Sequence, residues 1–150
     1  MKQTNSNQKG FTIVELLIVI IIISILAGLI VTTFSDFRRK SRNSERQNDI
    51  KFTQQAVENY YAQNEKYPTL GQLNDSAWRA KNMKTLGADE LQDPSGTKAS
   101  LATAPAANIY SYQPVAQDDG VCDNVTRDCM KYTLTATQEG GEVFTKNNFN

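Results

Sequence analysis

The sequence predicts an α+β protein in which one long N-terminal helix packs against a small antiparallel β-sheet. Three observations support this fold class. Residues 11–31 form a predominantly apolar run, residues 32–64 contain neither Gly nor Pro, and residues 108–145 alternate strand-forming residues with turn signals. The chain has 150 residues, which is enough for one modest domain beyond the apolar run.

The first predicted element is a helix over the apolar run Phe11–Val31, in which Glu15 is the only ionisable side chain. At ~1.5 Å per residue this helix is about 31 Å long, which matches the hydrocarbon core of a bilayer. The ten residues before it are polar, include Lys2 and Lys9, and end in Gly10. We therefore predict a leader at residues 1–10 and a membrane-spanning helix at residues 11–31.

The helix is predicted to continue through residues 32–66 as an amphipathic segment. Apolar and small polar side chains recur there at helical spacing: Ile50, Thr53, Val57, Tyr60 and Tyr61. Tyr67-Pro68 ends the helix, because Pro cannot continue the hydrogen-bond ladder and pushes the preceding residue toward extended geometry. The stretch from Arg38 to Asp49 is almost entirely polar, so we expect it to lie exposed outside the head.

Residues 67–150 are predicted to form a globular α+β head. A second helix is expected near Leu70–Leu86, followed by a loop at Lys98–Ala107. Strands are expected at 108–112, 130–137 and 142–145, with the turn Gln138-Glu139-Gly140-Gly141 between the last two. The sheet should pack on the C-terminal half of the long helix through Val57, Tyr60 and Tyr61.

Three features stand in fixed register at the N-terminus. A basic leader ends in Lys9-Gly10, Phe11 opens the apolar run, and the carboxylate of Glu15 follows. The stretch from Lys9 to Leu17, KGFTIVELL, resembles the signature of the type IV pilin and pseudopilin family, in which a leader ending in Gly precedes Phe-Thr-x-x-Glu-Leu-Leu. The resemblance covers residues 1 to about 35 closely, and the rest of the chain only in architecture.

The resemblance implies a pilin-like fold and a processing step. A prepilin peptidase would cut between Gly10 and Phe11 on the cytoplasmic side and methylate the new amine of Phe11. Glu15 would be the assembly residue, drawing an incoming copy into register in a filament. The implied partners are other copies of the chain, other pilins, the pilus assembly platform and, before assembly, the membrane.

The chemistry of Glu15 agrees with this implication. A carboxylate in hydrocarbon costs roughly 2.5 to 3.5 kcal/mol on insertion scales unless it is paired. Residues 11–31 contain no Lys or Arg, so the ammonium of a processed Phe11 would supply the missing positive charge. The alternative is a carboxylate close to the helix start that reaches water, where the helix dipole also favours an anion.

The charge distribution opposes the orientation that the resemblance implies. Residues 32–66 hold seven basic and five acidic side chains, with the excess at Arg38–Arg46. A count of Lys and Arg near the apolar run would place this side in the cytoplasm. The resemblance instead places the N-terminus in the cytoplasm and the head outside. The basic stretch could then contact acidic heads or phospholipid headgroups, although a solvated helix face is favoured.

Cys122 and Cys129 enclose six residues, and outside the cytoplasm this spacing favours a disulfide. Half of a metal site shared with another chain and a pair of reduced buried thiols are the alternatives. Four acidic residues around the loop are weak candidates for calcium ligands, although a solvated acidic loop is favoured: Asp118, Asp119, Asp123 and Asp128.

Composition excludes several classes of function. The chain has no His and only two Cys, so imidazole catalysis and a four-sulfur zinc site are excluded. We predict a non-enzymatic protein without a cofactor, because no nucleophile elbow or phosphate loop is present. The head has seven basic against ten acidic residues, which disfavours direct nucleic-acid binding.

The predicted function is a structural subunit of a type IV pilus-like filament. The precursor would lie in the cytoplasmic membrane with its head outside and then join an extracellular filament. A pseudopilin of a secretion or DNA-uptake system, forming a periplasmic pseudopilus, is the alternative within the family. A single-pass membrane-anchored surface binding protein is the alternative from another class, and a membrane-tethered enzyme is the least favoured.

Overall fold

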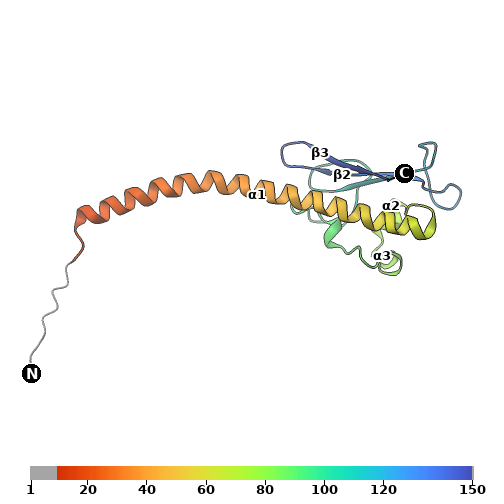
Figure 1. Cartoon of the computed structure of the whole chain (residues 1–150), viewed down its shortest axis with the longest axis horizontal. Coiled ribbons are helices and arrows are strands. Elements are labelled where there is room, and N and C mark those ends of the chain that lie inside the picture. The colour runs from red at the N-terminus through yellow and green to blue at the C-terminus, as the bar shows by residue number, and fades with distance from the viewer. Residues whose placement is uncertain (1–9, 150) are drawn as a thin grey trace, which may run out of the picture. The chain divides into compact units, whose positions relative to one another are not determined.

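The computed structural model describes residues 10–149, except for the side chains of residues 29–33. The chain divides into two compact units, residues 1–38 and residues 39–150, and the boundary lies within the first helix. Figure 1 shows the chain coloured from its N-terminus to its C-terminus, with most of its helices and strands labelled.

Helix α1 is a single unbroken helix of 52 residues, Ile13–Asn64. It ends where Glu65 adopts a left-handed φ of 57° and donates its N–H to the carbonyl of Tyr61 at 2.7 Å. Pro68 follows, so the predicted stop near Tyr67-Pro68 is confirmed to within a few residues.

The single helix predicted at Leu70–Leu86 is wrong in detail, because Asp75 divides this segment. Helix α2 spans Leu70–Asn74 and helix α3 spans Ser76–Asn82, and the 3₁₀ helix η1 follows at Asp89–Leu91. Asp75 is extended, with φ −85° and ψ 110°, and its carboxylate accepts the N–H groups of Ala77 and Trp78. It is thus the C-cap of α2 and the N-cap of α3.

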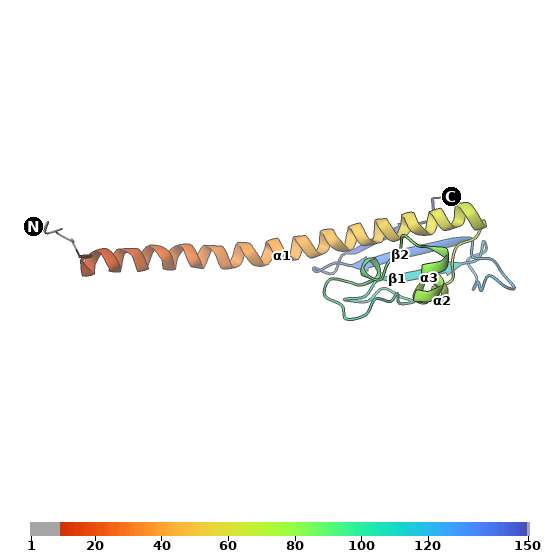
Figure 2. The same ribbon diagram turned by 90° about the horizontal axis from the view of Figure 1, so that it is seen from below.

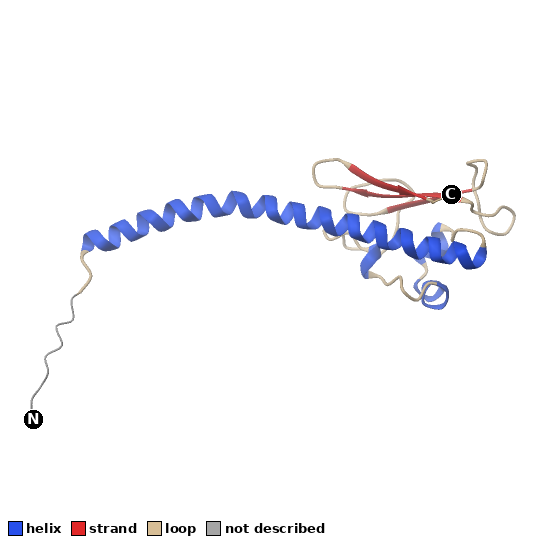
Figure 3. Ribbon diagram, in the orientation of Figure 1, coloured by secondary structure: helices blue, strands red, loops and turns tan. Residues whose placement is uncertain are grey.

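The sheet has three antiparallel strands in the order β1-β2-β3. Figure 3 colours the strands red. Strand β1 spans Ser111–Val115, β2 spans Lys131–Thr137 and β3 spans Val143–Asn147. Thr135 pairs with Ser111 on one side and with Thr145 on the other. The first strand begins later than predicted, because Asn108 has a left-handed φ of 59°. Pro114 is tolerated because β1 is an edge strand.

The core lies between the C-terminal half of α1 and the sheet. Figure 2 shows the strands beside this half of the helix, together with α2 and α3. The buried side chains of α1 include Ile50, Val57 and Tyr60, and those of the sheet include Tyr112, Tyr132 and Leu134. The predicted α+β architecture, with a long helix packed on a small antiparallel sheet, is therefore confirmed.

Tyrosine rings fill much of this core. The ring of Tyr67 stacks on that of Tyr61 with centroids 4.4 Å apart and meets the edge of Tyr132 at 4.7 Å. The hydroxyls of Tyr67 and Tyr132 both donate to the carboxylate of Glu58, at 3.1 and 2.7 Å. Buried aromatic rings thus contribute packing while their polar tips remain hydrogen-bonded.

The end of the chain is held on α1 by two polar side chains. The amide of Gln54 donates to the carbonyl of Asn147 at 2.6 Å. The carboxylate of Glu58 accepts the N–H of Phe149 at 3.1 Å. The edge strand β3 is therefore fixed both by β2 and by the long helix.

Candidate processing and assembly site

Residues 10–12, which directly precede α1, are exposed and have no regular secondary structure. Gly10, Phe11 and Thr12 lie outside the helix, and the side chain of Phe11 is 85% exposed. A Cβ placed on Gly10 would meet no atom within 4 Å. The Gly10–Phe11 peptide bond therefore lies in a non-helical, open stretch, as a protease substrate requires. The rest of the predicted leader, residues 1–9, lies outside the described residues.

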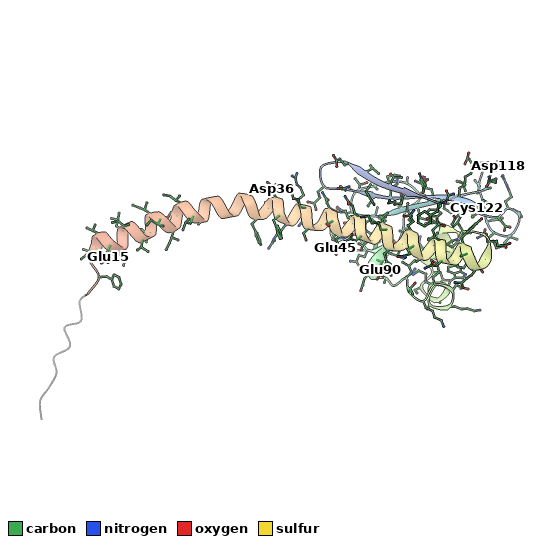
Figure 4. The ribbon with its side chains drawn as sticks, in the orientation of Figure 1. Glu15, Asp36, Glu45, Glu90, Asp118 and Cys122 are labelled. Carbon is green, nitrogen blue, oxygen red and sulfur yellow. A yellow bond between two sulfur atoms is a disulfide. The ribbon has the colours of Figure 1, made fainter. Side chains whose placement is uncertain are left out.

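Glu15 and Thr12 form a reciprocal cap at the start of α1. The Thr12 hydroxyl accepts the N–H of Glu15 at 3.2 Å, and the Glu15 carboxylate faces the N–H of Thr12 at 3.5 Å. This is the arrangement of a capping box, in which a Glu three residues after a Thr satisfies free N–H groups of the first turn. Figure 4 labels Glu15 at this end of the helix. Thr12-x-x-Glu15 before an apolar run is the sequence signature of this cap, a role that the predictions for Glu15 did not include.

The helix beyond Glu15 presents a bare apolar surface. The large apolar side chains from Ile13 to Leu26 are between 49% and 86% exposed. A contiguous exposed apolar surface of this kind marks a site that contacts other molecules or lipid. Glu15 is the only ionisable side chain of this run, so the charge and the apolar surface occur together.

Among the described residues, none of the helices is long and apolar enough to cross a bilayer. The predicted division of the chain into leader, spanning segment, amphipathic continuation and head stays a prediction.

The expectation that Arg38–Arg46 forms a solvated face is wrong for Arg46. Its side chain is 1% exposed, and its guanidinium binds the buried carboxylate of Asp93 through two bonds, Nε to Oδ2 at 2.7 Å and Nη2 to Oδ1 at 2.9 Å. The same guanidinium donates to Asn43, Ser95 and Glu139. Hydrogen bonds to Asp93 raise the pKa of Arg46 further above its usual value. The polar stretch is therefore partly core.

Arg42 belongs to the same network. Its guanidinium binds both oxygens of Glu139, at 2.5 and 2.8 Å, and this pairing lowers the pKa of Glu139 to about 2. The side chain of Asn43 accepts the N–H of Glu139 at 2.9 Å and donates to its carbonyl at 3.2 Å. The turn between β2 and β3 is thereby fixed to α1, which is why this part of the helix does not lie outside the head.

The structure joins Cys122 and Cys129 in a disulfide, with Cα atoms 5.1 Å apart. Asn124 supports the loop from within, at a left-handed φ of 58°. Its amide donates to the carbonyl of Tyr67 at 2.7 Å and accepts the N–H of Cys129 at 2.8 Å. The loop is therefore attached to the segment that follows α1 as well as closed by sulfur.

The four acidic candidates for calcium ligands are bound to N–H donors. The carboxylate of Asp123 accepts the N–H groups of the three residues 125–127, and these bonds lower its pKa. Asp118 pairs with Arg127, Asp119 with Lys131 and Asp128 with Lys66. Within the described part of the chain, no three acidic or Cys side chains gather as a metal site would require.

The fold and this site together define a class of protein: a helix with an exposed apolar N-terminal part and one capping carboxylate, followed in the chain by an α+β head. Residues 5–31 match the family model described as the prokaryotic N-terminal methylation motif. Over 108 residues the chain is 31% identical to the type II secretion system core protein G of Escherichia coli K12, covering 72% of this chain and 73% of that protein.

Two pilins are also similar. The type IV major pilin PilE1 of Neisseria gonorrhoeae is 36% identical over 139 residues, which is 93% of this chain and 57% of the pilin. The major pilin PilA of Myxococcus xanthus is 33% identical over 63 residues, which is 42% of this chain and 29% of that protein. No solved structure matches at a significant level. The chain belongs to the type IV pilin and pseudopilin family.

Proposed function

We propose that this chain is a structural, non-enzymatic subunit of a type IV pilus-like filament. It would be processed between Gly10 and Phe11 and would polymerise through Phe11 to about Thr33, with the heads forming the outer surface. The observation that carries this proposal is the position of Glu15, four residues after Phe11 at the start of an exposed apolar helix.

Processing supplies the charge that Glu15 lacks. Cleavage after Gly10 would convert the amide nitrogen of Phe11 into an ammonium, and methylation of this amine would retain the charge. When apolar helices pack together, an unpaired carboxylate among them is costly, whereas a carboxylate beside an ammonium is stabilised. Glu15 of one copy would therefore favour an incoming copy whose Phe11 lies next to it. The capping box holds Glu15 at the helix start, where that pairing would occur.

The membrane would hold the subunit before assembly. The precursor would lie in the cytoplasmic membrane with its N-terminus in the cytoplasm and its head outside, and an assembly platform would move it into an extracellular filament. The prepilin peptidase and other pilins would be its further partners. We propose no direct contact with nucleic acid, because the head carries ten acidic against seven basic residues.

A pseudopilin is the second candidate. The similarity to the secretion core protein G of E. coli over 73% of that protein favours it. In this case the same processing and the same helix packing would form a periplasmic pseudopilus, and no extracellular filament would be released by shearing.

The test is to shear cells and determine the N-terminal residue and intact mass of the protein in the sheared and membrane fractions. Methylated Phe11 in sheared filaments would establish a pilin, and the same form confined to the membrane fraction would favour a pseudopilin. An intact leader would overturn the proposal in favour of a membrane-anchored surface binding protein.

A pair of variants tests the role of Glu15. Glu15→Ala should insert normally but fail to assemble. Glu45→Ala, which removes another exposed carboxylate from α1, should assemble as the wild type does. Normal filaments from Glu15→Ala would contradict the proposed role of this carboxylate.

A further inference from the structure

We propose that the disulfide loop of one copy, residues 118–128, binds in a basic groove on the head of the next copy. The inference rests on the proposed function, since it concerns copies that assemble side by side. Both surfaces belong to the compact unit of residues 39–150, and no residue of the other unit takes part in this contact. Figure 4 labels Asp118 and Cys122 in the loop.

The groove lies between the C-terminal part of α1 and the end of α3. It consists of two adjoining hollows of about 460 and 200 Å³, which share three lining residues: Ala56, Asn59 and Thr85. The larger hollow is also lined by Tyr60 and Met83, whose side chains are buried. The rings of Tyr60 and Trp78 have centroids 5.2 Å apart, and this contact holds α3 on α1. The groove is thus a built feature of the head surface.

The groove carries positive charge without a counter-charge. Lys81 and Lys84 line the larger hollow, and both are exposed. Within the described residues, no acidic side chain lines either hollow, and neither ammonium forms an ion pair. An anionic group can therefore bind there without displacing a partner of the chain itself.

The disulfide loop is acidic and presents apolar side chains. Residues 118–128 include four Asp and one Arg, and the side chains of Val121 and Val125 are 87% and 89% exposed. Covering such side chains is favourable. Asp123 lies between them in the sequence, and no cation of the described chain pairs with its carboxylate, which its N–H donors keep ionised. The disulfide and the bonds of Asn124 fix the loop, so little conformational entropy is lost on binding.

The two surfaces complement each other and are separate in each copy. None of residues 118–128 lines either hollow. A copy can therefore offer its groove to one neighbour and its loop to another. A heterologous contact of this kind generates an open filament when its rotation does not close a ring. In the filament, the valines of the loop would cover the floor of the groove, and Asp123 would lie beside Lys81 and Lys84.

The size of the contact determines how it should be tested. A stable interface buries about 800 Å² on each partner, and one loop in a groove of about 460 Å³ falls short of that area. The contact would therefore orient the heads of copies that α1 already joins. Assembled material from the full chain, rather than an isolated head, is the sample that reports on it.

Carbodiimide cross-linking of assembled material is the test. The reagent activates a carboxylate, and a lysine amine in contact with it attacks the acyl carbon, so that an amide bond forms and a urea leaves. Two chains with different tags are co-expressed. The first carries Lys81→Arg and Lys84→Arg, which keep the charges of the groove but remove its amines. The second carries Asp123→Asn, whose amide oxygen can still accept the N–H groups of the loop.

The expected product is a heterodimer that carries both tags. Its amide bond should join Asp123 of the first chain to Lys81 or Lys84 of the second. No bond within either chain can give this product, because each chain lacks one of the two reacting groups. The peptide that contains the amide bond identifies the positions by mass spectrometry.

A charge variant of the loop tests the contact further. Val125→Arg in the first chain places a cation against the cations of the groove and should lower the yield of the heterodimer about tenfold. Val125 is 89% exposed, so this variant should keep the Tm of the unaltered chain. Val143→Arg is the matched control, because Val143 is half-exposed on β3, outside both surfaces, and should leave the yield unchanged. An equal yield from Val125→Arg and Val143→Arg would overturn the inference.

Two other results would overturn the inference and leave the proposed function intact. One is assembled material that gives no mixed heterodimer. The other is a heterodimer joined mainly through Lys98, an exposed lysine that lies outside the groove and has no ion pair within the described chain. If the processed chain does not assemble at all, the proposed function fails, and this inference fails with it.

Discussion

Replacing Arg46 by Met should strongly destabilise the head. Arg46 and Asp93 are each 1% exposed, and Arg46 supplies two hydrogen bonds to the Asp93 carboxylate. Met approximates the length of the arginine side chain but leaves the carboxylate buried without its cation. Removing one partner of a buried ion pair costs about 3–5 kcal/mol. For a unit of this size, that loss corresponds to a fall in Tm of roughly 10–20 °C.

A second variant separates the cost of the unpaired charge from the loss of packing. In Asp93→Asn the amide oxygen can still accept the N–H of Ser95, which the carboxylate now accepts at 2.8 Å. Adding Asp93→Asn to Arg46→Met removes the buried negative charge, so the double variant should unfold at a higher temperature than Arg46→Met alone. The two substitutions would then be strongly non-additive.

The assay is thermal unfolding of the full chain in detergent. It is monitored by the near-ultraviolet circular dichroism of the tyrosine-rich core. Arg38→Met is the matched control, because Arg38 is exposed and contacts the ring of Phe34 at 4.5 Å rather than a buried carboxylate. This variant should change Tm little. A similarly small change for Arg46→Met, or additive effects in the double variant, would refute the argument that Arg46 neutralises a buried charge.

Three further outcomes are expected for the head. The folded-state pKa of Glu139 is about 2, below the ordinary 4.5, so its carboxylate stabilises the head above pH 4.5 and loses this effect as the pH falls toward 2. Glu139→Gln should therefore make Tm depend less on pH between 4.5 and 2. An unchanged dependence of Tm on pH would contradict this. Burial raises the pKa of Asp49, so ionisation of this carboxyl opposes folding at neutral pH. Asp49→Asn, whose amide oxygen can still accept the Tyr110 hydroxyl, should raise Tm at pH 7, and this gain should disappear below the ordinary pKa of 3.8. A lower Tm at pH 7 would count against this. Replacing Cys122 and Cys129 together by Ser should lower the free energy of unfolding, measured in urea, by ~2–3 kcal/mol and leave a folded head. Failure of this variant to fold would show that the hydrogen bonds of the loop cannot hold it without the disulfide.

The sequence predicted the elements better than their polar connections. Helix and strand positions follow from local signals, such as the absence of Gly and Pro before Tyr67-Pro68 and the β-branched pattern of Lys131–Thr137. The split at Asp75 was missed because a single capping residue has a weaker pattern than the helical residues around it. Strand β1 was displaced because its start depends on the left-handed backbone of Asn108.

The role of Arg46 could not be predicted from local pattern. Its partner Asp93 lies 47 residues away, and a run of charged residues on a helix is usually solvated. Only the folded head brings the turn at Asp93 and the turn at Glu139 to the same side chain. By contrast, the Gly10-Phe11-Glu15 register was recognised directly, because its three features are adjacent in sequence and require no knowledge of the fold.

The polar ties between α1 and the head determine how residues 39–150 would carry a mechanical load. Arg42 and Arg46 hold the turn at Glu139, while Gln54 and Glu58 hold the end of the chain, so β3 is fastened to the helix beyond both of its ends. Tension along α1 would load these ties in parallel, as a shear between helix and strand. Groups loaded in parallel share the force and must break together, whereas groups in series break in succession. A head held by such parallel hydrogen bonds and ion pairs resists pulling until most of them break together.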